Sequence, residues 1–261
     1  MGSRPKAVAE AAAPSYHGYL YLDDLLRLQR PVAEPTAHDE LMFIVVHQVY
    51  ELWFRVLLHE LTAVRDALLG RDAHRAALLL GRCHAIERQA LTAFDVLDTL
   101  SPQGFQEFRD ALAPASGFQS VQYREIEILS AGGNRRHLVT PRQLSAEARR
   151  QLARRLAEPS VWDAFLTLLA GHGFAVDHPA GRCAALLSIA RGDRYRELWR
   201  LAEGLIDHDQ SWRLWRGRHA LLAERQIGVK TGTGGSTGVS YLRLGEHEPF
   251  FPELWEVRSQ L

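Results

Sequence analysis

The sequence predicts an all-α fold, a single domain of long antiparallel helices. Apolar residues recur at helical spacing in several stretches, most strongly between residues 38 and 69. The chain has no run of alternating apolar and polar residues and no hairpin dipeptide between strand-like segments. It shows no internal repeat, and 261 residues are enough to bury a sizeable core. We therefore expect helices that pack on helices.

The expected helices lie between clear breakers. Residues 1–15 are rich in small residues and we expect them to be disordered, so that the helical domain spans 16–261. Ser101 followed by Pro102 is a strong helix start, and Thr140 with Gln143 forms a capping box. In chain order the expected helices cover 15–29, 38–69, 73–100, 101–113, 116–130, 140–158, 161–171, 184–190, 194–208 and 210–227.

Composition excludes several classes of function. The 31 basic and 31 acidic residues cancel, so nothing electrostatic indicates nucleic acid or an anionic membrane as a partner. The longest apolar run covers only 41–46, whereas a spanning helix needs about 20 apolar residues. The N-terminus lacks the apolar centre of a signal peptide. Cys83 and Cys183 make no disulfide framework, and we expect reduced thiols in a cytoplasmic protein.

The stretch KTGTGGSTG, residues 230–238, is a glycine-rich loop. It lacks a Walker A pattern because Lys230 precedes the glycines, and it lacks a dinucleotide fingerprint because Thr237 stands where the third glycine belongs. Glycines let the backbone approach a ligand closely, and hydroxyls such as that of Thr233 offer hydrogen bonds with little bulk. The loop is either a flexible surface connection or a lid over a small polar ligand.

Two helices offer a polar group on an apolar face. Phe43 and His47 are four residues apart and share a face, where His47 is either a core histidine or a functional one. Phe105 and Arg109 have the same spacing. Arg109 either extends along apolar surface to solvent or provides a bidentate fork for a carboxylate.

A third helix carries an inward histidine. Trp212, Trp215 and His219 lie on one stripe, so His219 is either a core histidine or a proximal heme ligand. The sequence contains no H-E-x-x-H, C-x-x-C or C-x-x-C-H motif and no strand–turn–helix nucleophile. Together these groups describe a pocket with aromatic walls, a carboxylate-binding arginine, a polar lid and two inward histidines.

Several blocks of the chain resemble a known family. HDELMFIVVHQVYELWF, SPQGFQEFRDALAPASGFQSVQYREIE and GVKTGTGGSTGVSYLR look like signature blocks of the tryptophan 2,3-dioxygenases, and YHGYLYLDDLL and FFPELWEVR match more weakly. The resemblance implies an all-helical enzyme, usually a homotetramer in this family, that uses heme b with ferrous iron. It also implies the reaction, in which both atoms of O2 are inserted across the indole C2–C3 bond of L-tryptophan. The product is N-formylkynurenine, which makes this a step of tryptophan catabolism in the kynurenine pathway.

The resemblance also implies roles for individual residues. His219 matches the proximal ligand of the heme iron, and His47 matches the distal histidine that faces the indole N–H. Phe43 and Phe105 match the walls of the indole pocket, and Arg109 matches the residue that holds the substrate carboxylate.

The remaining matched residues lie in loops and in the N-terminal segment. Thr233, in the lid, matches the contact to the substrate ammonium group. Ser116 and Gly117 match the turn beside the heme. Tyr16 and Tyr19 match residues that reach into the site of a neighbouring subunit.

Two alternatives stay open at the level of sequence. Some relatives are heme monooxygenases that insert one oxygen atom into tryptophan or a β-methylated tryptophan, and the same pocket residues suit that chemistry. The second alternative is a helical protein that binds heme without catalysis, but such a protein needs no substrate anchor of the Arg109 and Thr233 kind. The chain departs from the family pattern at Thr237, where serine is more usual, and in the segment after Glu127.

Overall fold

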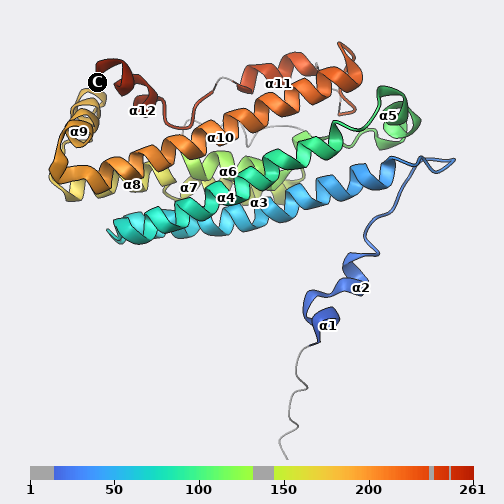
Figure 1. Ribbon diagram of the computed structural model, residues 1–261, viewed down its shortest axis with the longest axis horizontal. Helices are drawn as coiled ribbons and strands as arrows, with labels where there is room; N and C mark the ends of the chain where they lie inside the picture. Colours follow the sequence, from blue (N-terminus) through green and yellow to red (C-terminus); the bar gives the residue numbers. More distant parts are fainter. Residues whose placement is uncertain (1–14, 132–143, 235–237, 247) are drawn as a thin grey trace, which may run out of the picture.

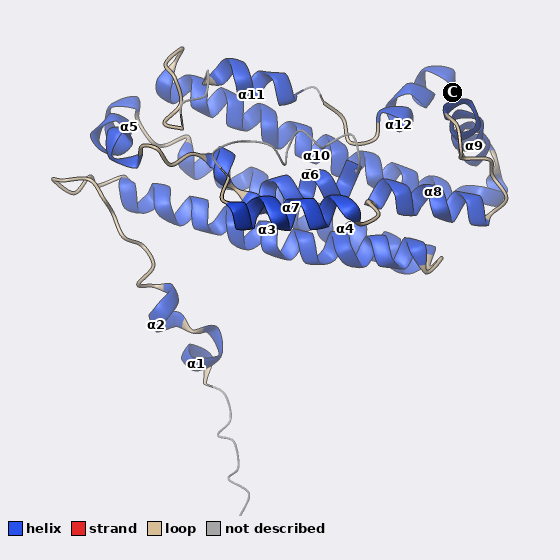
Figure 2. Cartoon of the chain, turned by 180° about the vertical axis from the view of Figure 1, so that it is seen from behind, coloured by secondary structure: helices blue, strands red, loops and turns tan. Residues whose placement is uncertain are grey.

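The computed structural model describes residues 15–131, 144–234, 238–246 and 248–261, and the secondary structure of this part of the chain is entirely helical (Figure 2). This confirms the all-α prediction. The α-helices are α1 (Tyr16–Leu20), α2 (Leu22–Leu25), α3 (Glu40–Leu69), α4 (Ala73–Leu97), α5 (Pro102–Arg109), α6 (Val121–Ala131), α7 (Ala146–Ala157), α8 (Val161–Gly171), α9 (Pro179–Arg191), α10 (Arg196–Ile227), α11 (Val239–Glu246) and α12 (Pro252–Val257). Short 3₁₀ turns are η1 (Asp110–Leu112), η2 (Gly117–Gln119), η4 (Asp193–Tyr195) and η5 (Arg258–Gln260).

Three long helices, α3, α4 and α10, run side by side along the molecule (Figure 1). A tight turn at Gly70 makes α3 antiparallel to α4. The helices α4 and α10 are parallel, because His84 in the middle of α4 contacts the carbonyl of Gly204 in the first half of α10, and Gln226 near the end of α10 donates to the carbonyl of Leu100 just after α4. The helices α6 and α8 cover α3, and α11 lies along α10. The N-terminal end of α3 and the C-terminal ends of α4 and α10 therefore meet beside α5.

The N-terminal segment stands apart from this bundle in both views (Figures 1 and 2). The single helix expected over 15–29 is two short helices, because Tyr21 adopts a left-handed conformation with φ of 51° between them. No residue of α1 or α2 is buried, so no packing energy stabilises a continuous helix here. Disorder was expected over 1–15; residues 1–14 lie outside the described residues, and Ser15 is instead the N-cap of α1.

The two helices expected over 194–208 and 210–227 are one helix, α10. The polar stretch Asp207–Gln210 does not end it, because two of its members are buried and have partners. Asp209 accepts hydrogen bonds from the backbone N–H groups of Phe250 and Phe251 and from the indole of Trp255. These bonds fasten the segment before α12 to the middle of α10.

The other polar member, His208, is the centre of a fully buried network. Its Nδ1 contacts the carboxylate of Glu87 on α4, and its Nε2 lies 2.8 Å from the hydroxyl of Ser130 on α6. That hydroxyl donates to the carbonyl of Ile126 at 2.8 Å, so Nε2 of His208 is the donor to Ser130. The network joins three helices with polar bonds inside an otherwise apolar core.

Several helix boundaries differ from the expected ones. The helix expected from residue 140 begins at Ala146, where the Ser145 hydroxyl caps the N–H of Ala148, and the expected capping box at 140–143 lies outside the described residues. The helix expected over 184–190 begins earlier, because Pro179 occupies its first position. The segment after Ser116 first forms η2, and α6 begins only at Val121.

One described helix, α3, is long and apolar enough to cross a membrane by length and composition alone. The core helix of a soluble protein meets the same criterion. Because α3 packs against α4, α6 and α8, we interpret it as a core helix of the bundle.

Candidate active site

Phe43 and His47 occupy one face of α3, near its N-terminal end. Their ring centroids are 4.1 Å apart, and Nδ1 of His47 lies 2.7 Å from the carbonyl oxygen of Phe43. A carbonyl can only accept, so Nδ1 carries the proton and Nε2 keeps the lone pair of the neutral ring. His47 can therefore accept a hydrogen bond from a ligand N–H through Nε2.

The surroundings of His47 favour this neutral form. Desolvation by neighbouring protein atoms lowers its pKa, an effect that the Phe43 carbonyl and the charge of Glu51 only partly oppose. The residue still keeps a solvent-accessible face. It is thus a neutral imidazole that a ligand can reach.

The aromatic wall of the site comes from α3 and α5. The Ser101 hydroxyl caps α5 and Pro102 occupies its first turn, which confirms the predicted helix start. The ring of Phe105 lies 5.7 Å from that of Phe43, and the fully buried ring of Phe108 lies 5.3 Å from both. These three phenyl rings offer an apolar surface suited to a flat aromatic ligand.

Arg109 ends α5 with a largely buried side chain, of which only 14% is exposed. Its Nη2 donates to the carbonyl of Thr231 at 2.5 Å, and its Nη1 lies 3.8 Å from the carboxylate of the exposed Asp110. The Nε–H is buried and has no acceptor among the described residues. A buried guanidinium with an unused N–H beside an aromatic wall is suited to a ligand carboxylate.

His219 lies on α10, and its ring centroid is 5.3 Å from that of the buried Trp215. Burial, and to a smaller extent a positive charge on His47, lower the pKa of His219 to about 4. The two histidines therefore act on each other across the space between α3 and α10. At neutral pH His219 is the neutral imidazole that binds metal ions.

The residues around His219 fit a heme group. A heme iron takes most of its ligands from the porphyrin, so one neutral imidazole such as that of His219 is a sufficient protein ligand. Polar atoms of Tyr50, Trp215 and Gln226 are buried without a hydrogen-bond partner within the described ranges. A prosthetic group between α3 and α10 would offer such atoms partners that the protein does not.

The described part of the glycine-rich loop closes on α5 and on the turn after it. Besides the contact of Thr231 with Arg109, the Thr233 hydroxyl donates to the carbonyl of Ala115 at 2.7 Å. Gly234 lies directly against Ser116. The structure thus brings Arg109, Thr233 and Ser116 together at the loop.

Three of the candidates lie elsewhere or take no part in these contacts. Tyr16 and Tyr19 are each 72% exposed on α1, which projects away from the bundle, so the structure does not bring them to the site of their own chain (Figure 1). Gly117 opens η2, and a Cβ atom there would have no neighbour within 4 Å among the described residues.

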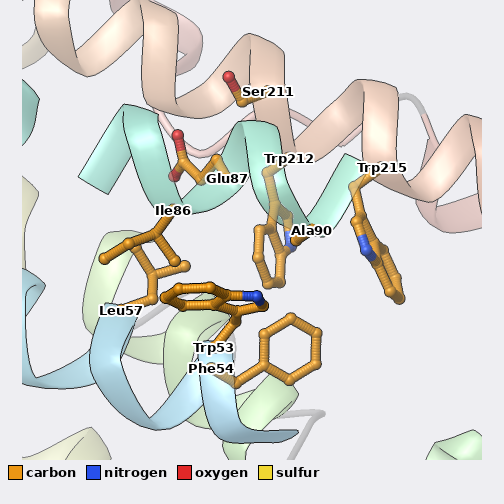
Figure 3. A pocket seen from close by; sticks show the side chains of 9 residues that line it. All are labelled: Trp53, Phe54, Leu57, Ile86, Glu87, Ala90, Ser211, Trp212 and Trp215. Atoms are coloured by element: carbon orange, nitrogen blue, oxygen red, sulfur yellow. The ribbon is translucent and has the colours of Figure 1, made fainter. Parts of the chain in front are cut away.

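Two hollows that the described residues form lie away from this site. A cavity of about 10 Å³ lies between α3, α4 and α10, where the indoles of Trp53 and Trp212 converge (Figure 3). It is no larger than one water molecule and cannot hold an indole ring. A larger open hollow of about 750 Å³ includes Arg71, His172 and Arg194 at the opposite end of the bundle.

Sequence reasoning missed three contributors to the site. Phe108 and Trp215 were expected to be apolar neighbours of Arg109 and His219, and only the structure shows that their rings complete the walls. Helical spacing from Phe105 and from His219 is the signal that could have found them. The Thr231 carbonyl has no sequence signal, because any residue offers one.

Comparisons with known proteins agree with the resemblance seen in the sequence. A model of the family described as tryptophan 2,3-dioxygenase matches residues 3–142 and 139–261. The chain is 49% identical to a tryptophan 2,3-dioxygenase of Nocardioides sp. over 257 residues, which cover 97% of this chain and 96% of the relative. It is 40% identical to that of Herpetosiphon aurantiacus, with 95% and 99% of the two chains covered. The enzyme of Geobacillus thermodenitrificans is 39% identical, with 95% and 92% covered.

Proposed function

Because the chain belongs to the tryptophan 2,3-dioxygenase family, we propose that it uses O2 to open the indole ring of L-tryptophan, giving N-formylkynurenine. It is an oxidoreductase of tryptophan catabolism. The observation that best supports the substrate is Arg109, whose buried guanidinium has an unused Nε–H beside three phenyl rings. An amino acid with a flat aromatic side chain matches both features.

The substrate is bound at its two ends. Arg109 holds the carboxylate, Thr233 accepts a hydrogen bond from the ammonium group, and Phe43 and Phe105 contact the indole ring. Burying the zwitterion without these partners would cost several kcal/mol. An indole that lacks the amino-acid group therefore binds poorly.

His47 orients the indole ring. Its Nε2 lone pair accepts a hydrogen bond from the indole N–H, because Nδ1 already donates to the Phe43 carbonyl. The indole N–H is a very weak acid, so this contact positions the ring and need not remove the proton. The lowered pKa of His47 keeps the acceptor available at neutral pH.

His219 would hold heme b through its neutral imidazole, with Ser116 and Gly117 beside the group. When bound, heme supplies ferrous iron, the centre at which dioxygen reacts. The chain's own residues orient the amino acid and exclude water. The glycine-rich loop contributes to that exclusion, since its described part closes on Arg109 and on Ala115.

The protein works as a cytoplasmic homotetramer in which residues 16–261 form one domain. The N-terminal segment reaches the site of a neighbouring subunit, which would cover the exposed rings of Tyr16 and Tyr19 and the exposed Leu26. Free thiols at Cys83 and Cys183 suit a reducing compartment.

Product mass tests the reaction directly. Heme-loaded, reduced protein is given L-tryptophan and ¹⁸O-labelled oxygen gas, and we expect a product that contains both labelled atoms. A product with one labelled atom would instead identify a monooxygenase of the same family, to be followed with β-methyltryptophan. Heme-loaded protein that turns over neither substrate would contradict an enzymatic role.

A further inference from the structure

The backbone of Gly234 lies so close to Ser116 that a residue with a Cβ atom would not fit at position 234. A Cβ atom built on Gly234 falls 2.5 Å from Cβ and 2.9 Å from Oγ of Ser116, well inside contact distance. The φ angle of Gly234 is not in the left-handed region, so its backbone does not need glycine. The close approach to Ser116 is therefore the physical reason for glycine at this position.

The contacts on either side of Gly234 depend on this approach. One residue earlier, the Thr233 hydroxyl donates to the carbonyl of Ala115, the residue before Ser116. Three residues earlier, the Thr231 carbonyl accepts from Arg109 at 2.5 Å. Moving the backbone at 234 away from Ser116 would lengthen both hydrogen bonds.

The base of the loop is also closed tightly. Gly238 adopts a φ of 68°, and a Cβ atom there would fall 2.5 Å from the carbonyl oxygen of Lys230. The two described ends of the loop thus meet at Lys230 and Gly238. The contact with Ser116 fixes the loop at a point away from that base.

We propose that Gly234 and Ser116 form a size-matched seat that sets the position of the loop over the substrate. Both are positioning residues, since they act through Thr233 and Arg109, which contact the amino-acid end of tryptophan. This inference rests on the proposed function for the identity of the ligand. The seat itself is a property of the chain and can be measured without substrate.

The rate of proteolysis at Lys230 measures how often the loop opens. Lys6 and Lys230 are the only lysines of the chain, so a lysine-specific protease reports on this one position of the loop. The protease Lys-C therefore cuts at the loop and at one site near the N-terminus, which serves as an internal control. The bond after Lys230 is cut when the loop opens locally. In Gly234→Ala the added Cβ displaces the loop, and we expect cleavage at Lys230 to become about tenfold faster at an unchanged Lys6 rate.

Substitutions at Ser116 decide whether the displacement arises from this contact. Ser116→Gly removes both clashing atoms, so Ser116→Gly with Gly234→Ala should be cut at Lys230 as slowly as Ser116→Gly alone. Ser116→Ala keeps the Cβ atom that lies 2.5 Å away, so Ser116→Ala with Gly234→Ala should stay fast. Gly245→Ala on α11 is the matched control, because a Cβ there meets nothing within 4 Å among the described residues, and it should behave as wild type.

Turnover by the heme-loaded enzyme gives the second readout. Gly234→Ala should raise KM for L-tryptophan about tenfold while kcat changes less than about twofold, and the double variant with Ser116→Gly should return to the KM of Ser116→Gly alone. The seat is refuted if Gly234→Ala leaves the Lys230 rate unchanged, or if Ser116→Ala rescues it as well as Ser116→Gly. A wild-type protein without N-formylkynurenine activity would instead refute the proposed function, and the Lys-C rates would still decide the seat.

Discussion

His47 on α3 and His219 on α10 are electrostatically coupled, because a positive charge on His47 lowers the pKa of His219. Burial alone already disfavours the protonated form of each ring. Both imidazoles are therefore neutral at physiological pH, and a neutral imidazole keeps one nitrogen lone pair. One lone pair suits iron, and the other suits the indole N–H of a substrate.

Replacing each histidine should separate these two roles. His219→Ala should lose stable heme and its Soret band, because no other side chain is assigned to the iron. His47→Ala should keep the Soret band and lose turnover, because the indole is no longer oriented. Absorption spectra and turnover assays of both variants check this. A full heme complement in His219→Ala would contradict its assignment as the ligand.

The stability of the heme-free protein should fall at acidic pH. The folded-state pKa of His47 is lowered, whereas the unfolded chain binds the proton with a pKa of about 6.5. Below about pH 6.5 the unfolded state therefore binds more protons, and the free energy of unfolding decreases as the pH falls.

His47→Gln cannot titrate, so its urea midpoint should change less between about pH 7.5 and about pH 5 than that of the wild type. Burial also lowers the pKa of His219, which destabilises the fold at acidic pH in the same way. Some dependence of the urea midpoint on pH should therefore remain in His47→Gln. If the urea midpoint of His47→Gln changed with pH as much as that of the wild type, His47 would not contribute to the loss of stability at acidic pH.

Arg109→Leu should raise KM for L-tryptophan by about 10- to 100-fold, since it removes charge-assisted hydrogen bonds worth about 1.5–3 kcal/mol. Steady-state kinetics measures this. Arg150→Leu on α7 is the control, because Arg150 is exposed and its ion pair within the described part of the chain is with the nearby Glu147 on the same helix. Unchanged tryptophan affinity in Arg109→Leu would refute the carboxylate role.

His208→Ala should cost about 3–5 kcal/mol of stability, because it leaves the carboxylate of Glu87 buried without its partner. Replacing both members by leucine should cost less, since no uncompensated charge then remains. Urea unfolding of the heme-free proteins measures both. A loss below about 1 kcal/mol in His208→Ala would mean that water reaches Glu87.

Mixed oligomers test the placement of Tyr16 and Tyr19. Chains with both tyrosines changed to alanine should have weak activity, and so should chains with Arg109→Leu. If the N-terminal segment serves a neighbouring subunit, mixing and reassembling the two should create some intact sites and restore part of the activity. Activity no higher than the sum of the separate variants would place the tyrosines outside the neighbouring site.

The sequence predicted the elements whose signals are local. The helix over 161–171 was predicted to the residue, and the structure shows a capping box of Ser160 and Asp163 at its start. Gly70 ends α3 as expected, and the apolar stripe from Phe43 to Phe54 faces other helices. These features depend on neighbours within one helical turn.

The failures share a long-range cause. The polar residues near His208 looked like a helix break. Nothing close to them in the sequence indicates that His208 would be buried and bonded to Glu87 and Ser130. The contact between Arg109 and the carbonyl of Thr231 joins residues more than a hundred positions apart. The family resemblance supplied the roles of the site residues, whereas spacing alone left each of them open.

The continuity of α10 makes this stretch of chain intolerant of insertions. One helix carries both Asp209, which anchors the segment before α12, and His219, the proposed heme ligand. Each residue of an α-helix adds about 100° of rotation and about 1.5 Å of rise. A single residue inserted between Asp209 and His219 would rotate the side chain of His219 by about 100° around the helix axis while Asp209 stayed in place. Natural variation in this interval should therefore change side chains and keep its length.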